Sequence, residues 1–111
     1  MIANPRGDQV RDLSEFPLPE LSQIIGVLTD IDDTLTTEGQ LSAAAYCALE
    51  NLQLAGIRVI PVTGRPAGWC DHIARMWPVD AVIGENGAFW MRYDKHRKKL
   101  STVFATASLK D

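Results

Sequence analysis

The sequence predicts an α/β fold, a Rossmann-like parallel sheet flanked by helices and followed by a C-terminal β-hairpin. Apolar runs of strand length alternate with helical stretches in the order strand, helix, strand, helix, strand, which is typical of a parallel sheet. Each run ends on polar or glycine residues, and ligands of such sheets bind beyond the carboxyl ends of the strands. The 111 residues suffice for one domain. We expect an irregular lead-in over residues 1–23 and a partial core over residues 24–111.

The first elements follow from local signals. Residues 1–23 mix proline, glycine and charge without a sustained period, which predicts irregular structure. The apolar run at residues 24–28 alternates too little for a half-exposed strand and predicts one buried on both faces. Ser42 can cap a helix over residues 43–55, and Gly56 can end it.

The remaining elements repeat the pattern. Residues 57–62 are rich in β-branched side chains and predict a second strand. A helix over residues 66–77 follows, because proline suits a first helical turn. A third short strand is expected at residues 81–83. Residues 89–93 and 100–104 flank a basic turn and predict a β-hairpin.

Composition excludes several classes of protein. The net charge of −3 implies no general affinity for nucleic acid. The basic residues within 92–99 indicate a solvated turn or, as the alternative, a rim that attracts phosphate; their role is otherwise open. No apolar run approaches the roughly 20 residues that a membrane span needs. Cys47 and Cys70 are too few for a disulfide framework, so we expect buried free thiols and a cytoplasmic protein.

An acidic cluster follows the first predicted strand. Asp30, Asp32 and Asp33 place three carboxylates within four residues, and their mutual repulsion needs a cation, hydrogen bonds or raised pKa values to offset it. If the backbone stays extended through Ile31, Asp30 and Asp32 point to the same side. Such a pair can act as nucleophile and general acid/base, or hold Mg²⁺. The alternative is an ordinary acidic turn.

Threonines stand at both strand ends. Thr34 adds a hydroxyl to the acidic loop, and Thr63 ends the second predicted strand just before a helix. A threonine hydroxyl and the free amides of a helix's first turn can donate to a phosphate oxygen. Thr63 alone could be an ordinary strand-end residue. Together, the two strand ends predict a phosphate site at one edge of the sheet.

These motifs resemble a known family. Residues 27–35 resemble the first motif of the haloacid dehalogenase-like superfamily, and residues 59–65 resemble its second. Residues 81–88 are similar to a stretch of the IIB branch, which includes sugar-phosphate phosphatases. The resemblance covers residues 24–93.

The resemblance implies a Mg²⁺-dependent phosphomonoester hydrolase that acts through an aspartyl-phosphate on a sugar phosphate or similar small metabolite. Asp30 would attack phosphorus, and Asp32 would protonate the leaving alcohol and then activate water. Thr63 would orient the phosphoryl group. The Asp30 carboxylate and the Asp32 carbonyl would bind Mg²⁺. Further candidates for contacting phosphate or substrate lie in the same loops: Thr34, Gly64, Arg65 and Asn86.

The chain departs from the family where a cap domain, a third-motif lysine and a fourth-motif acidic pair would follow. We therefore expect a truncated chain that is weak or inactive alone, completed by a missing C-terminal half or by self-association. One alternative is a non-catalytic fragment or subunit that needs a partner. Another is a phospho-acceptor receiver domain, whose aspartate would stand where Gly84 and Glu85 do. The three tryptophans are expected to be packing residues rather than a ligand platform: Trp69, Trp77 and Trp90.

Overall fold

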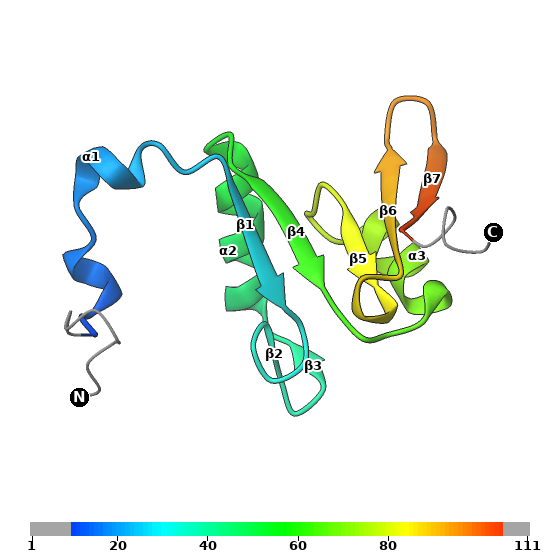
Figure 1. Ribbon diagram of the computed structural model, residues 1–111, viewed down its shortest axis with the longest axis horizontal. Coiled ribbons are helices and arrows are strands. Elements are labelled where there is room, and N and C mark those ends of the chain that lie inside the picture. Colours follow the sequence, from blue (N-terminus) through cyan, green and yellow to red (C-terminus); the bar gives the residue numbers. More distant parts are fainter. Residues whose placement is uncertain (1–9, 106–111) are drawn as a thin grey trace.

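The structure of the chain is a computed structural model that describes residues 10–105 (Figure 1). The first nine residues of the expected lead-in, and the residues after 105, lie outside the described part. The elements follow one another as η1 (Leu13–Glu15), α1 (Leu18–Leu21), β1 (Gly26–Asp30), β2 (Thr36–Thr37), β3 (Gln40–Leu41), α2 (Ala43–Leu54), β4 (Arg58–Val62), α3 (Ala67–Met76), β5 (Val82–Gly84), η2 (Glu85–Gly87), β6 (Phe89–Asp94) and β7 (Lys99–Phe104).

Five strands form one sheet in the order β1-β4-β5-β6-β7. The pairs β1–β4 and β4–β5 are parallel, whereas β6 and β7 form an antiparallel hairpin that extends the same sheet from β5. Helices α2 and α3 both lie on the face of the sheet that is turned away from the viewer in Figure 1. The predicted α/β class and its C-terminal hairpin are therefore confirmed.

The core fills the space between the sheet and the two helices. Val59 of β4 and Val82 of β5 are fully buried there, with Ile73 of α3 almost so. Gly84 has no room for a side chain, because a Cβ atom at this position would lie 2.6 Å from the Cys70 sulfur. Close packing of α3 against β5 therefore depends on that glycine.

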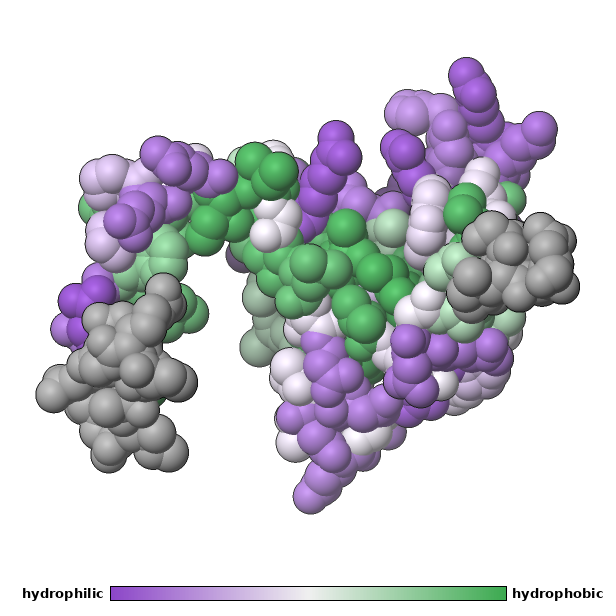
Figure 2. Space-filling view, in the orientation of Figure 1, coloured by the Kyte–Doolittle hydropathy of each residue, from purple (hydrophilic) through white to green (hydrophobic). Residues whose placement is uncertain are grey.

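The opposite face of the sheet is open in the described chain. Strand register places Val62, Ile83, Trp90 and Val103 in one row across it, and pairs Leu28 with Ile60. Figure 2 shows this face as an apolar area at the centre of the molecule.

The expectation that the first strand is buried on both faces is wrong for the described chain. Strand β1 stands at the edge of the sheet, and Leu28 is 67% exposed. Helix α2 lies on one side of the sheet only, and none of the described elements lies against the other side of β1.

Local signals set the ends of α2. The Ser42 hydroxyl accepts the Ala45 N–H at 3.1 Å, and Gly56 follows the helix with a φ of +81°. Both confirm the sequence prediction. The small antiparallel pair β2–β3 was not predicted. Its turn holds Glu38 and Gly39 at positive φ, as a tight hairpin requires, and a glutamate there gives little sequence signal.

The two cysteines differ in their surroundings. Both are free thiols as expected, but Cys47 is exposed and only Cys70 is buried. Cys47 lies two residues before Leu49, the buried residue of α2, so it points to another side of that helix. The basic turn at residues 95–98 is exposed, as a solvated turn requires. Within residues 10–105, no helix is long and apolar enough to cross a membrane.

Candidate active site

The carboxyl ends of β1 and β4 bring two predicted site segments together. Their parallel register pairs Asp30 with Val62, the residue directly before Thr63. Neighbouring strands lie about 5 Å apart, so the loop after β1 begins beside the loop after β4. The two predicted site segments therefore lie side by side at one edge of the sheet.

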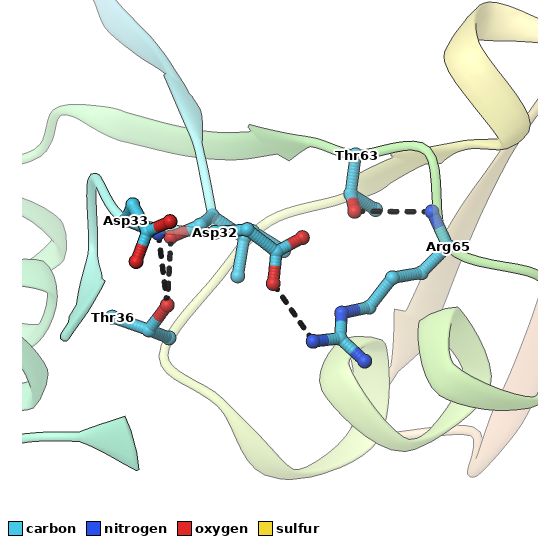
Figure 3. A network of polar contacts seen from close by, with 6 residues as sticks. Asp32, Asp33, Thr36, Thr63 and Arg65 are labelled. Carbon is cyan, nitrogen blue, oxygen red and sulfur yellow. Dashed lines mark hydrogen bonds and ion pairs between the residues drawn. The ribbon is translucent and has the colours of Figure 1, made fainter. Parts of the chain in front are cut away.

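The acidic loop is wound around the carbonyl oxygen of buried Ile31. This oxygen accepts the N–H groups of Leu35 and Thr36, each at 3.0 Å, and the Thr36 hydroxyl at 3.1 Å. The same hydroxyl accepts the Asp33 N–H at 3.3 Å, and Asp33 has a positive φ of 58° (Figure 3). Thr36 is buried and was not singled out from the sequence, yet it fixes the turn that presents the carboxylates.

Asp30 ends β1 with an exposed side chain. The Thr34 hydroxyl donates to its Oδ2 atom at 3.2 Å, so Thr34 orients the carboxylate. A carboxylate has more acceptor sites than this one bond uses. The Asp30 carboxylate is therefore oriented and open to solvent.

Asp32 is held by a cation from the other loop. The Arg65 guanidinium donates to Asp32 Oδ1 at 2.7 Å, with the two side chains 31% and 51% exposed, respectively. The same guanidinium lies 4.3 Å from the centre of the Trp69 ring. Figure 3 shows the Arg65 side chain reaching across to Asp32 from the loop that carries Thr63. Arg65 thus neutralises one charge of the acidic cluster, as the repulsion argument requires.

Thr63 is buried and has its backbone fixed on both sides. Its N–H donates to the Ile83 carbonyl at 2.9 Å, and its carbonyl accepts the Asn86 N–H at 3.1 Å. Its hydroxyl oxygen accepts the Arg65 N–H at 3.1 Å. A hydroxyl that accepts still has a proton to donate, so Thr63 can act as a positioned donor.

Gly64, in the loop after β4, and Asn86, in the loop after β5, complete the edge. Asn86 has a left-handed φ of 56° within η2, and a Cβ atom on Gly64 would lie 3.1 Å from its Oδ1 atom. Glu85 N–H donates to the Arg65 carbonyl at 3.0 Å. Three loops, after β1, β4 and β5, therefore converge on the predicted residues. One contact group joins Asp30 to Thr34, and the other joins Asp32, Thr63, Gly64, Arg65 and Asn86.

The donors suit a hard cation only in part. Within residues 10–105, no group of three or more His, Cys, Asp or Glu side chains could hold a metal ion. Magnesium does not need one, because it is usually bound by one or two carboxylates, with waters and substrate phosphate filling the remaining positions. The exposed Asp30 carboxylate fits that role, and the residues present therefore fit Mg²⁺ as part of its ligand set.

Comparison with protein families identifies the family of this chain. Residues 27–110 match the model of haloacid dehalogenase-like hydrolases, which spans most of the sequence. The chain belongs to this family. The comparison with curated proteins finds no match.

Three solved structures have a fold similar to that of this chain. A phosphatase of the haloalkanoate (HAD) enzyme superfamily from Bacteroides thetaiotaomicron is 32% identical over 62% of this chain, with a TM-score of 0.54. A haloacid dehalogenase-like hydrolase from the same organism is 21% identical over 71% of the chain, with a TM-score of 0.58. A hypothetical protein from Geobacillus kaustophilus HTA426 is 22% identical over 79%, with a TM-score of 0.53. The chain spans 26%, 31% and 49% of these three proteins, respectively.

Proposed function

We propose that this hydrolase is a Mg²⁺-dependent phosphatase of the IIB branch, which cleaves a sugar phosphate or similar small phosphomonoester in the cytoplasm. The observation that carries the proposal is that exposed Asp30 pairs with Val62, the residue before buried Thr63, at neighbouring strand ends. The likeness to a phosphatase from Bacteroides thetaiotaomicron supports it further.

Three residues of this chain take part in the first step of the reaction. An Asp30 carboxylate oxygen forms a bond to phosphorus while the bond from phosphorus to the alcohol oxygen breaks. Asp32 gives its proton to the departing alcohol oxygen, and the Thr63 hydroxyl donates to a phosphoryl oxygen. In-line positioning and charge neutralisation are what phosphoryl transfer chiefly needs.

Water completes the reaction. It attacks the phosphorus of the aspartyl-phosphate, the bond from phosphorus to Asp30 breaks, and Asp32 accepts the water's proton. Bound at the Asp30 carboxylate and the Asp32 carbonyl, Mg²⁺ would offset the negative charge of the phosphoryl group.

Arg65 contacts Asp32, the proposed acid, and can also bind the phosphate of the substrate. The 2.7 Å ion pair engages the Asp32 side chain that the proposed mechanism uses on the leaving alcohol. A phosphate dianion offers the guanidinium a second acceptor, and arginine binds phosphate in the same forked geometry as carboxylate. We propose that Arg65 turns from Asp32 toward phosphate on binding and leaves Asp32 free to contact the alcohol oxygen. Gly64 and Asn86 would shape the same phosphate pocket.

We also propose that this chain needs further residues for full activity, supplied by a C-terminal half or by self-association. It spans less than half of the three solved structures it resembles. Within residues 10–105 no strand pairs with the outer edge of β1, and Leu28 is exposed. These features favour, as a second candidate function, a module that acts only with a partner. On the first view the isolated chain turns over slowly, and on the second it does not turn over without its partner.

The test is hydrolysis of p-nitrophenyl phosphate with and without Mg²⁺, in the wild type, Asp30→Asn and Asp33→Asn. We expect slow, metal-dependent turnover that is lost in Asp30→Asn and kept in the matched neighbour, whose side chain has no assigned role. Equal rates in the wild type and Asp30→Asn would rule out catalysis by this chain alone. The partner-dependent module would then be the better description.

A further inference from the structure

We propose that residues 10–24, which we call the arm, dock on the open apolar face of the sheet in a second copy of this chain, so that two copies exchange arms. The arm consists of η1, α1 and the turns that lead to β1. The inference deepens the self-association part of the proposed function. It concerns mass and not turnover, so it stands or falls independently of the chemistry.

The arm carries apolar side chains that its own chain leaves uncovered. Neither η1 nor α1 has a buried residue. Leu13 is 79% exposed and Leu18 is 76% exposed, and the other large apolar residues exposed on the arm are Val10, Phe16 and Leu21. Figure 2 shows open space between the arm and the body of the molecule. Apolar side chains gathered on one exposed segment are typical of a surface that contacts another molecule.

The open face of the sheet offers a matching apolar surface. Leu28 and Ile60 are paired there across β1 and β4, and Trp90 and Val103 are paired across β6 and β7. Trp90 was expected to be a packing residue, but it is 39% exposed on this face, and Trp69 on α3 is 53% exposed. Both long helices lie behind the sheet (Figure 1), so no helix within residues 10–105 covers this face. Covering it would remove apolar area from water, which favours association.

Charge favours the arm as the segment that covers this face. The arm has a net charge of −2, because it holds three carboxylates and one cation: Asp12, Glu15, Glu20 and Arg11. Arg58 and Arg92 lie on the open face, since each stands two residues from an apolar residue of that face in its strand. In the described residues, neither arginine forms an ion pair. Such complementary charges orient two partners as they associate.

The two arginines border one hollow of the open face together with Asp80. The Asp80 carboxylate is already engaged, because it accepts the Val59 N–H at 2.7 Å and a Gln53 side-chain N–H at 3.3 Å. The carboxylates of an incoming arm are therefore the acceptors that suit the arginines.

The arginines also determine where on the face the arm lies. Arg58 pairs with Gly26 at the amino end of β1, whereas Asp30 ends the same strand. The two ends are about 13 Å apart at the usual rise of a strand. Asp30 shares the open face with Leu28 and would repel the carboxylates of the arm. The arm therefore lies toward the amino ends of β1 and β4, and the phosphoryl site stays open to substrate.

The backbone directs the arm away from its own sheet, as Figure 1 shows. Successive backbone hydrogen bonds lead from α1 into β1: from Ser22 to Leu18 at 3.0 Å, from Ile24 to Leu21 at 3.2 Å and from Arg58 to Ile25 at 3.0 Å. To cover its own sheet, the arm would have to give up turns of this series. A second copy can bind the arm as it stands, and two copies can then exchange arms about a two-fold axis.

The experiment is sedimentation equilibrium of the full chain from low micromolar to submillimolar concentration, without substrate. The variants are Leu18→Ser in the arm and Leu28→Ser on the open face, and the control is Leu54→Ser in α2, behind the sheet. All three leucines are at least 67% exposed, so none of the changes should disturb the monomer. We expect the wild type to form a dimer as its concentration rises. Leu18→Ser and Leu28→Ser should each weaken the dimer about a hundredfold or more, because each removes a leucine from both contacts.

A mixture of the Leu18→Ser and Leu28→Ser chains separates arm exchange from other dimers. The first chain keeps an intact face and the second an intact arm, so the mixture should form a heterodimer through one complete contact. A dimer built on sheet faces or on β1 edges alone would ignore Leu18→Ser and gain nothing from mixing.

Four results would overturn the proposal: a wild type that stays monomeric, a dimer that persists in Leu18→Ser, a mixture that stays monomeric, or a control Leu54→Ser weakened as much as the other two. None of them bears on the phosphatase chemistry, which the Asp30→Asn assay tests separately.

Discussion

The ion pair between Arg65 and Asp32, 2.7 Å long, joins two loops whose residues lie 33 positions apart in the chain. Both side chains are partly exposed, so solvent screens the attraction. Measured exposed pairs contribute about 0–1 kcal/mol to stability. The pair therefore matters less for folding than for placing a cation beside the proposed acid.

Replacement of Arg65 by methionine should separate the two effects. We expect Arg65→Met to weaken binding of inorganic phosphate about tenfold or more, because a charge-assisted hydrogen bond is lost. Its free energy of unfolding in urea should change by less than about 1 kcal/mol. Calorimetry and urea titration measure the two quantities. The matched control is Arg97→Met, which removes an exposed arginine paired with Asp94 in the hairpin and should leave phosphate binding unchanged. Equal phosphate affinities in the two variants would contradict the role of Arg65.

The Thr36 hydroxyl offers a test of the acidic loop. Thr36→Val keeps the side-chain shape but leaves the Asp33 N–H and the Ile31 carbonyl without that partner. We expect a loss of about 1–2 kcal/mol in the free energy of unfolding. Urea titration should show almost no change for Thr37→Val, because Thr37 is the exposed neighbour in the same strand. Similar losses in both variants would mean that strand β2, rather than the loop, is the sensitive feature.

Much of the fold could be predicted where local and tertiary preferences agree. Ser42 caps α2 and Gly56 ends it, as the sequence indicates, because both effects act within a few residues. The β6–β7 hairpin likewise has a local signal in two apolar runs around a polar turn. The exposure of Leu28 could not be predicted, since it depends on which elements flank β1 in space.

The candidate site was predictable to a similar extent. Asp30 ends one strand and Thr63 follows the next, and parallel pairing alone brings such residues to one edge. The contact of Arg65 with Asp32 depends on side-chain rotamers and on how two loops approach, which spacing does not encode. Thr36 could not be singled out from the sequence, because whether a threonine is buried depends on the tertiary structure around it.

Gly84 tests the packing between sheet and helix. A methyl group there would lie 2.6 Å from the Cys70 sulfur and 2.8 Å from Phe89 Cε2, so Gly84→Ala must push α3 or β6 away. We expect a loss of about 1–3 kcal/mol, the usual cost of overpacking. Gly68→Ala is the control, since nothing lies within 4 Å of that position, and it should be neutral or stabilising by up to about 1 kcal/mol. Equal thermal unfolding of wild type and Gly84→Ala would show that this contact can relax freely.

The two free thiols should differ in reactivity. Cys47 is exposed, whereas Cys70 lies in the core, and thiol reagents attack the accessible thiolate. At pH 8 we expect a disulfide reagent to label one thiol rapidly in the native wild type and none in Cys47→Ser. Urea should restore labelling in Cys47→Ser by exposing Cys70. Rapid native labelling of Cys47→Ser would mean that α3 opens readily from the sheet.

Cys70 also predicts how stability depends on pH. Burial raises the pKa of its thiol above the ordinary value, and the negative charge of Glu85 adds to the effect. The folded state therefore holds the proton more tightly than the unfolded state. The Cys70 thiol therefore contributes to the free energy of unfolding in full below the unfolded pKa of about 8.5. This contribution is lost as pH rises through the higher pKa of the folded state.

The measurement is the free energy of unfolding of the wild type and Cys70→Ala, at pH 7 and at several values above 9. Cys70→Ala should be less stable at pH 7, because it leaves a cavity in the core. Its stability should then fall less steeply above pH 9, so the difference between the two proteins narrows. Tyrosines and lysines titrate in the same range, but they are common to both chains and cancel in the difference. A constant gap across this range would show that the thiol ionises equally in the folded and unfolded states, contrary to its burial between α3 and β5.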